Sequence, residues 1–177
     1  MAPLERSMNR WLNDFLGAPR QWLTWMGLSA VGMLMFGLYL QHVVGLEPCP
    51  MCIVQRYALL GVAVVSACGA LSSRRGWQVF WSLALVGKAG FGAFTAARQS
   101  WLQWYPPEVV SCGRDLYGMI ENFPLQRVIP MVFKGSGDCS KVDWTFLGGS
   151  IANWSFVVFC GYVLLGLTLA WRLAQKR

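Results

Sequence analysis

Two cysteines separated by two residues are the clearest chemical feature of the sequence, in the motif Cys49-Pro50-Met51-Cys52. In a C-x-x-C motif the sulfurs lie close enough to form a small disulfide, and the thiolate is the species that performs exchange. The motif precedes an apolar stretch typical of a helix, and the dipole and free N–H groups of a helix N-terminus stabilise a thiolate. Arg56 follows Cys52 by one helical turn on the same face. The spacing predicts a redox-active pair beside a cation.

Cys112 and Cys139 are a second candidate pair, and both have small or turn-forming neighbours. Cys112 follows Pro106-Pro107, and Cys139 follows Gly135-Ser136-Gly137. We expect both to be exposed in a long, soft loop. A disulfide that closes such a loop can open to an attacking thiolate without disrupting a core, so the pattern predicts a labile, catalytic bridge.

Other interpretations of the cysteines stay open at this point. Four thiolates would suit a structural zinc ion, although the second pair is not itself a C-x-x-C and lacks a compact knuckle around it. A purely structural disulfide is also compatible with an oxidising compartment. The remaining two of the six cysteines, Cys68 and Cys160, lie inside apolar stretches. We expect these two to behave as small apolar side chains, and we predict no metal site.

The composition places the chain in a membrane. Apolar residues make up 55% of the 177 residues and charged residues only 13%, whereas about a quarter of an ordinary globular protein is charged. So few charges do not cover the surface of a soluble fold of this size. The net charge of +7 does not indicate nucleic-acid binding, because the basic residues separate apolar runs instead of forming a stripe on one face.

Four stretches are long and apolar enough to cross the hydrocarbon core as helices, at about residues 22–45, 53–71, 77–97 and 149–171. The sequence therefore predicts an all-α integral membrane fold, a four-transmembrane-helix bundle that forms a single domain over residues 1–177. Residues 46–52 and 98–148 would be the two outer loops. In the longer loop, apolar residues at helical spacing from Leu116 to Phe123 predict a short amphipathic helix.

The basic residues predict the orientation of these spans. They gather before the first stretch, between the second and third, and after the fourth: Arg6, Arg10, Arg20, Arg74, Arg75, Arg172, Lys176 and Arg177. By the positive-inside rule both termini are cytoplasmic, and both cysteine-bearing loops face outward. Lys88 lies near the middle of the third stretch, where a charge is costly, and we expect it to face the bundle interior.

Pro48-Cys49-Pro50-Met51-Cys52 with Arg56 resembles the first outer loop of a known family, the bacterial disulfide bond formation protein B family, DsbB. The similarity covers nearly the whole chain in order. It continues through Trp101-Leu102-Gln103, Tyr105-Pro106, Cys112, Phe133, Ser136-Gly137-Asp138-Cys139 and Trp144-x-Phe146-Leu147-Gly148.

The resemblance implies a quinone-dependent thiol oxidase of the bacterial inner membrane, in contact with membrane lipid and with its cysteine loops in the periplasm. A reduced thioredoxin-fold oxidase resembling DsbA would attack Cys112 and form a mixed disulfide. Cys139 would then be freed to engage Cys49, which would leave Cys52 as a thiolate beside the quinone. Cys52 would donate electrons to ubiquinone or menaquinone, and Arg56 would hold a quinone oxygen and stabilise the thiolate.

Gln99 marks a departure from the family pattern. Some family members have a histidine near the quinone at the end of the third helix, and this chain has Gln99 at the matching position. A glutamine can donate a hydrogen bond but does not shuttle a proton near neutral pH. Gln99 is therefore a candidate quinone-binding residue that cannot act as an acid or a base.

Two further hypotheses compete with the quinone-linked thiol oxidase. The first is an enzyme similar to vitamin K epoxide reductase, which also joins quinone and disulfide chemistry in a four-helix bundle. That family has its C-x-x-C at the last helix, whereas here the motif follows the first span. The second is a four-span scaffold whose loop disulfides are structural. Such a scaffold would keep its cysteines permanently oxidised, while an enzyme would cycle them.

Overall fold

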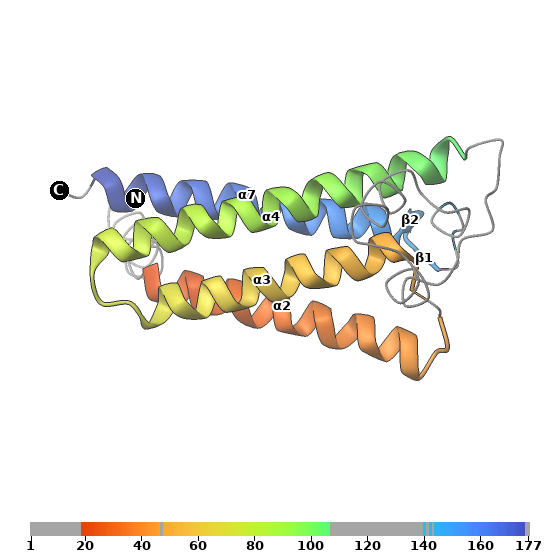
Figure 1. Cartoon of the computed structure of the whole chain (residues 1–177), viewed down its shortest axis with the longest axis horizontal. Helices are drawn as coiled ribbons and strands as arrows, with labels where there is room; N and C mark the ends of the chain where they lie inside the picture. Colours follow the sequence, from red (N-terminus) through yellow and green to blue (C-terminus); the bar gives the residue numbers. More distant parts are fainter. Residues whose placement is uncertain (1–18, 47, 107–139, 141, 143, 176–177) are drawn as a thin grey trace, which may run out of the picture.

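The computed structural model describes residues 19–46, 48–106, 140, 142 and 144–175 of the chain. The predicted site residues Cys112 and Cys139, and the predicted amphipathic helix of the long loop, lie outside these residues. Long helices make up most of the described part (Figure 1). They are α2 (Pro19–His42), α3 (Pro50–Leu71), α4 (Arg75–Trp104) and α7 (Ile151–Gln175).

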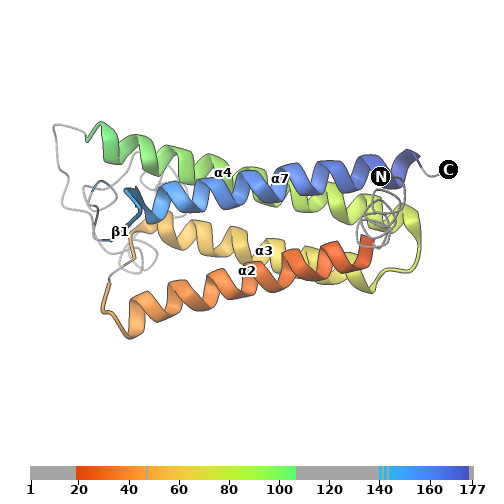
Figure 2. The same ribbon diagram turned by 180° about the vertical axis from the view of Figure 1, so that it is seen from behind.

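All four helices are long and apolar enough to cross a membrane. They run side by side, with α4 and α7 along one side of the bundle and α2 and α3 along the other, as both views show (Figures 1 and 2). Neighbouring helices pack closely in the order α2, α3, α4, α7, whereas α2 and α7 touch at only a few positions. The predicted four-helix membrane fold is confirmed, and it leaves one open seam, between α2 and α7.

The bundle core consists of apolar side chains from all four helices, among them Leu23, Val62, Leu85 and Phe159. The closest packing is between α4 and α7 at Gly92. A Cβ atom on Gly92 would lie 2.3 Å from the ring of Phe159, which is nearer than real contacts allow. The absent side chain at this position therefore lets the phenylalanine ring lie directly against the backbone of α4.

A short hairpin precedes α7 at the end of the bundle where α3 begins (Figure 1). Strand β1 (Thr145–Phe146) pairs antiparallel with β2 (Gly149–Ser150). The two residues between the strands, Leu147 and Gly148, have positive φ values of 51° and 79°. Positive φ at both central residues is the signature of the tight turn that matches the twist of paired strands. The hairpin thus turns the chain sharply into α7.

Two helix ends differ from the apolar stretches of the sequence. Helix α4 continues to Trp104, past Arg98 and Gln99, because helical hydrogen bonding does not stop where an apolar run stops. Helix α3 begins at Pro50, so the second cysteine of the motif lies within its first turn. Both differences bring polar side chains into the same end of the bundle.

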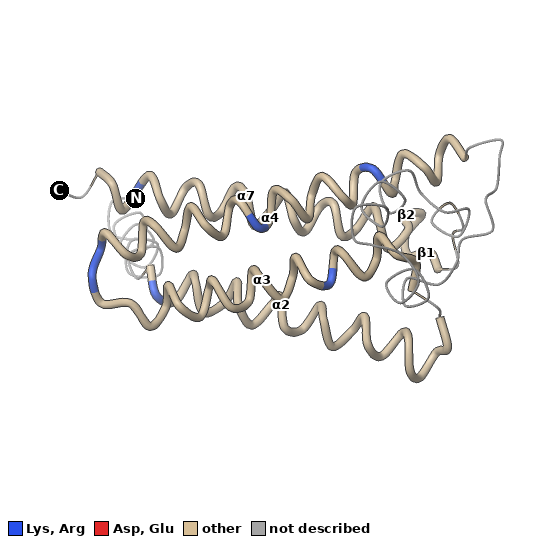
Figure 3. The backbone as a smooth tube through the Cα atoms, viewed as in Figure 1, with Lys and Arg blue, Asp and Glu red and all other residues tan. Residues whose placement is uncertain are grey.

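One end of the described bundle carries more basic residues than the rest of it, where a few lie along the helices (Figure 3). Arg20 at the start of α2 donates hydrogen bonds to the Ser72 carbonyl oxygen (3.3 Å) and the Ser73 hydroxyl (3.3 Å), just before Arg74 and Arg75. This end therefore carries a cluster of cations, while the cysteine motif lies at the opposite end.

The expectation for Lys88 is wrong. Its side chain is exposed on the surface of the bundle instead of facing the interior. The carbons of its stem lie over Gly61 of α3, with Cδ 3.3 Å from where a Cβ atom of the glycine would be. Since the described residues include no aspartate or glutamate, the interior described here offers the ammonium group no counter-charge.

Candidate active site

The C-x-x-C motif forms the N-terminal cap of α3. Cys49 has an extended backbone (φ −68°, ψ 160°), and its Sγ accepts a hydrogen bond from the Cys52 N–H at 3.4 Å. Pro50 occupies the first helical position, where its fixed φ suits the helix and its missing N–H costs nothing. The two sulfurs are 3.0 Å apart, so only a small movement separates them from disulfide distance.

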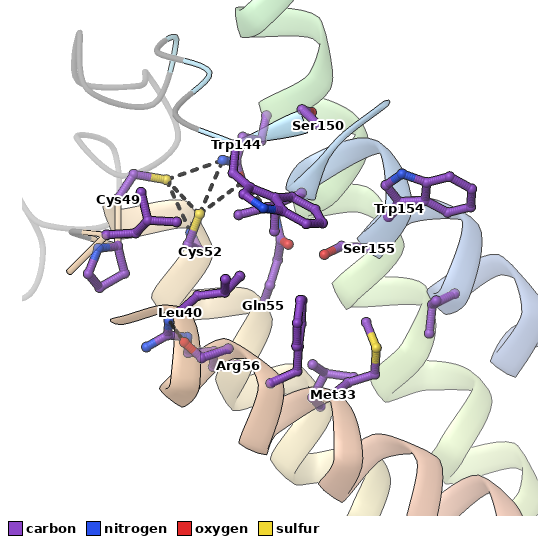
Figure 4. A pocket seen from close by; sticks show the side chains of 18 of the residues that line it. Met33, Leu40, Cys49, Cys52, Gln55, Arg56, Trp144, Ser150, Trp154 and Ser155 are labelled. Carbon is purple, nitrogen blue, oxygen red and sulfur yellow. Dashed lines mark hydrogen bonds between the residues drawn. The ribbon is translucent and has the colours of Figure 1, made fainter. Parts of the chain in front are cut away.

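An amide from another helix lies against both sulfurs. Gln99 of α4 donates through Nε2 to Cys49 Sγ at 3.3 Å and to Cys52 Sγ at 3.2 Å. Dashed lines in Figure 4 mark these contacts. The Oε1 atom of Gln99 accepts a hydrogen bond of 2.7 Å from Nε2 of Gln55, a residue of α3. Both glutamines are buried, with 3% and 4% of their surface exposed. The sequence-predicted residues Cys49, Cys52 and Gln99 therefore lie together in one hydrogen-bonded group.

Arg56 is near this group, but its described hydrogen bonds run to α2. One terminal nitrogen donates to the Gly37 carbonyl oxygen at 2.9 Å, and the other donates to the Gln41 side chain. A Cβ atom on Gly37 would lie 3.4 Å from Nε of Arg56, so the glycine gives the guanidinium room to lie on α2. The cation is thus held in place by α2 and stays at the wall of the cavity described next.

A cavity of about 540 Å³ lies between the hairpin and the halves of the helices nearest the cysteine motif. This volume is in the range of about 300–1,000 Å³ typical of small-molecule sites. Its described lining joins the sulfurs and polar groups to apolar and aromatic side chains. The lining residues are Met33, Phe36, Gly37, Leu40, Leu46, Pro48, Cys49, Cys52, Gln55, Arg56, Leu59, Gln99, Gln103, Trp144, Phe146, Ser150, Ile151, Trp154, Ser155 and Val158.

Aromatic rings form the side of the cavity away from α3. The rings of Trp144 and Phe146 stack at 6.0 Å with an interplanar angle of 11°, and Trp144 meets Phe36 of α2 edge-on at 6.0 Å. Trp154 of α7 donates from Nε1 to the Phe146 carbonyl oxygen at 2.9 Å, which ties the hairpin to α7. Figure 4 shows Trp154 on α7 and the cysteines on α3, with the cavity between these helices. A flat, apolar molecule fits such surroundings.

Comparison with known proteins identifies the family. A family model described as "Disulfide bond formation protein DsbB" matches residues 19–169. The chain belongs to the DsbB family. Its relatives in that family include proteins named "Disulfide bond formation protein B" from Albidiferax ferrireducens, 65% identical over 167 residues (94% of each chain), and from Polaromonas naphthalenivorans, 66% identical over 164 residues (93% of this chain and 98% of the relative). A third, from Paracidovorax citrulli, is 61% identical over 165 residues (93% of each chain).

Membership of the DsbB family confirms the resemblance and the four-helix membrane fold. The residues that match the family model include Cys112 and Cys139 as well as the described part of the site. Since the structure does not describe these two cysteines, their pairing and their role stay predictions.

Sequence reasoning missed Gln55, Gln41 and the aromatic side of the cavity. Gln55 lies three residues after Cys52, on the same side of a helix, and a polar residue in an apolar span was a usable signal. Gln41 carried no comparable signal, and Trp144 and Phe146 were noted only as residues of the family resemblance. Their places at the site depend on how α2 and the hairpin pack against α3. The DsbB-family site is therefore larger than the residues that the motifs alone indicate.

Proposed function

We propose that this DsbB-family protein reoxidises a periplasmic dithiol protein with a thioredoxin fold and transfers the two electrons to a membrane quinone. The observation that carries this proposal is the cavity, in which a cysteine pair, a cation and three glutamine amides meet an apolar, aromatic space inside a membrane bundle. The names of the relatives support disulfide formation as the outcome of the reaction.

The lining of the cavity suits the head group of a quinone. The aromatic rings of Trp144 and Phe146 offer faces for stacking on a planar ring. Arg56 and Gln103 supply hydrogen-bond donors in the same lining, as two carbonyl oxygens require. A quinone takes up two electrons and two protons and becomes a quinol. The sulfur of Cys52, the proposed electron donor, is part of the same lining.

The electrons reach Cys52 by disulfide exchange, in which each step breaks one S–S bond and forms another. A thiolate of the partner attacks a Cys112–Cys139 disulfide at Cys112 and frees the Cys139 thiolate. Cys139 attacks a Cys49–Cys52 disulfide at Cys49 and frees the Cys52 thiolate. The second thiolate of the partner then attacks its mixed disulfide with Cys112, so that the partner leaves with its own disulfide and the Cys112 thiolate is freed. Cys112 attacks the Cys49–Cys139 disulfide, which re-forms Cys112–Cys139 and frees Cys49. The reduced Cys49–Cys52 pair closes into a disulfide as its two electrons and two protons pass to the quinone, which becomes a quinol.

The start of α3 and the Gln99 amide stabilise the Cys52 thiolate before it transfers its electrons. The first turn of α3 points its N–H groups and its positive dipole end toward the motif, since Cys49 caps this helix. The amide of Gln99 adds N–H donors at 3.2–3.3 Å from the sulfurs. Arg56 supplies the positive charge that a preorganised site holds ready for negative charge developing in the cavity.

The proposed location is the bacterial inner membrane, with both termini in the cytoplasm and the cysteine loops in the periplasm. The cluster of cations at one end of the bundle supports this orientation, because basic flanks stay on the cytoplasmic side. An oxidising periplasm is also where disulfides persist.

Quinone reduction by the purified protein tests the proposal. The full chain is mixed with quinone and a reduced thioredoxin-fold dithiol protein, and the absorbance of the quinone is followed. We expect one quinol per partner disulfide, no quinol with Cys52→Ser, and slower turnover with Arg56→Ala. Cys68→Ala is the control, since Cys68 lies within α3 away from the cavity. Unchanged turnover in Cys52→Ser would reject the electron donor, and cysteines that stay oxidised throughout would favour a scaffold.

A further inference from the structure

We propose that Gln55 is a positioning residue that orients the Gln99 amide, so that a neutral N–H donor always faces the cysteine sulfurs. The inference rests on the proposed function, because the thiolate that this donor stabilises is the electron donor of that reaction. Gln55 does not contact either sulfur through any hydrogen bond described here; its contact is with Gln99 Oε1 at 2.7 Å.

The orientation follows from the donors and acceptors of one amide group. A glutamine side chain has a carbonyl oxygen, which only accepts, and an NH₂ group with two donor hydrogens. In Gln99 the oxygen is occupied by Gln55 Nε2, which leaves both hydrogens for the two sulfurs at 3.3 and 3.2 Å. The number of donors on Gln99 thus equals the number of sulfurs.

The opposite orientation of Gln99 is unfavourable as long as Gln55 donates to it. Turning the amide over would aim its oxygen at the sulfurs and bring its NH₂ group against the NH₂ group of Gln55. Both side chains are almost fully buried, so water does not relieve the lost hydrogen bonds. A protonated Cys52 can still donate to Gln99 Oε1 at 3.7 Å, but a thiolate has no hydrogen to donate and depends on the Nε2 donors.

The amides of Gln55 and Gln99 are neutral at every pH at which the thiols ionise, unlike the ionisable groups near them. Among the described residues that line the cavity, Arg56 is the only charged side chain, and Cys49 is the titratable neighbour of Cys52. Neither amide gains or loses a proton near neutral pH. The Gln55–Gln99 pair therefore remains a donor over the whole range in which the thiols ionise, so that its contribution does not fade with pH.

The rate of Cys52 alkylation against pH measures this effect without any quinone. The full chain in detergent is reduced and treated with iodoacetamide, and peptide mass spectrometry reads each cysteine separately. Because a hydrogen bond to a charged group contributes about 1.5–3 kcal/mol, we expect Gln55→Met to raise the midpoint of the Cys52 profile by about one pH unit. Gln78→Met is the matched control, since Gln78 is equally buried (5% exposed) but bonds to the Ser72 carbonyl oxygen far from the motif.

A double substitution separates a positioning role from a merely structural one. If Gln55 acts through Gln99, Gln55→Met adds nothing to the shift already produced by Gln99→Met. Equal shifts from Gln55→Met in the presence and absence of Gln99 would overturn the inference, as would an unmoved midpoint in the single variant.

Gln55→Leu keeps the inference testable if Gln55→Met does not fold. Its side chain is close in size to the amide but donates no hydrogen bond, so it no longer holds the oxygen of Gln99. We again expect the midpoint of the Cys52 profile to rise, and no shift would overturn the inference. Absence of quinol formation in the native protein would reject the proposed function but would leave these profiles intact, so the two failures are distinguishable.

Discussion

The Gln99 amide of α4 lies 3.2 Å from the Cys52 sulfur at the start of α3. This contact joins two helices at Cys52, the residue that the proposed function makes the electron donor. It exists because α4 runs on past its apolar stretch and buries Gln99 (3% exposed) beside the motif.

Loss of the Gln99 donor should slow electron transfer from Cys52. Gln99→Leu keeps the volume but removes both N–H groups, and a hydrogen bond to a charged sulfur is worth about 1.5 kcal/mol or more. We expect quinone reduction about tenfold slower in a stopped-flow assay with the reduced partner in excess. Gln99→His restores a ring N–H donor and should recover most of the rate. Equal rates for Gln99→Leu and the native chain would show that the amide has no part in this step.

The Arg56 side chain, which extends from α3, rests against Gly37 of α2. This contact predicts that a substitution of Gly37 changes quinone binding. In Gly37→Val the new side chain occupies the space of the guanidinium, whose Nε would be 3.4 Å from the Cβ atom. Displacing one hydrogen bond of the cation costs about 1 kcal/mol, so the KM for quinone should rise about fivefold with little change in kcat. Gly87→Val is the control, because nothing lies within 4 Å of a Cβ atom there. An unchanged KM in Gly37→Val would mean that the position of Arg56 does not matter for quinone binding.

The packing of Gly92 on Phe159 predicts a change in stability. A Cβ atom in Gly92→Ala would lie 2.3 Å from the Phe159 ring, and overpacking a core typically costs about 1–3 kcal/mol. Gly90→Ala makes the same change two residues earlier, where nothing lies within 4 Å. Thermal unfolding in one detergent should give a lower midpoint for Gly92→Ala and an equal or higher one for Gly90→Ala. Similar midpoints for the two variants would contradict the close approach of α4 and α7.

The membrane spans and the cysteine pair could be predicted from the sequence, because each depends on residues that are close together along the chain. Apolar runs gave the four spans, and the C-x-x-C spacing with Arg56 indicated the redox pair. The Gln55–Gln99 hydrogen bond was not predictable, because it depends on the rotation of α4 against α3. Lys88 shows the same limit, since an apolar span does not tell which face of its helix meets the bundle.

The seam between α2 and α7 is where we expect the apolar tail of the proposed quinone to bind. A second hollow of about 360 Å³ lies there, and it shares Met33 and Val158 with the lining of the site cavity. Among the described contacts, a hydrogen bond of 2.9 Å between the Ser29 and Tyr162 hydroxyls joins the two helices at this level. Because the two hollows adjoin at Met33 and Val158, we expect the apolar tail of the proposed quinone to lie along this seam.

A side chain that fills the second hollow should raise the KM for long-tailed quinones but not for tail-less ones. Gly161 lines the second hollow, and nothing lies within 4 Å of a Cβ atom there, so Gly161→Leu adds bulk without a clash. We expect the KM for a long-tailed quinone to rise about fivefold, since lost contacts of ~1 kcal/mol are typical of one or two displaced methylene groups. The KM for a tail-less quinone should not change, because the head group binds in the site cavity. Gly87→Leu, on the exposed face of α4, is the control for both substrates. An equal rise for both quinones would mean that Gly161→Leu disturbs the head-group site, and no rise for either would exclude the seam as the path of the tail.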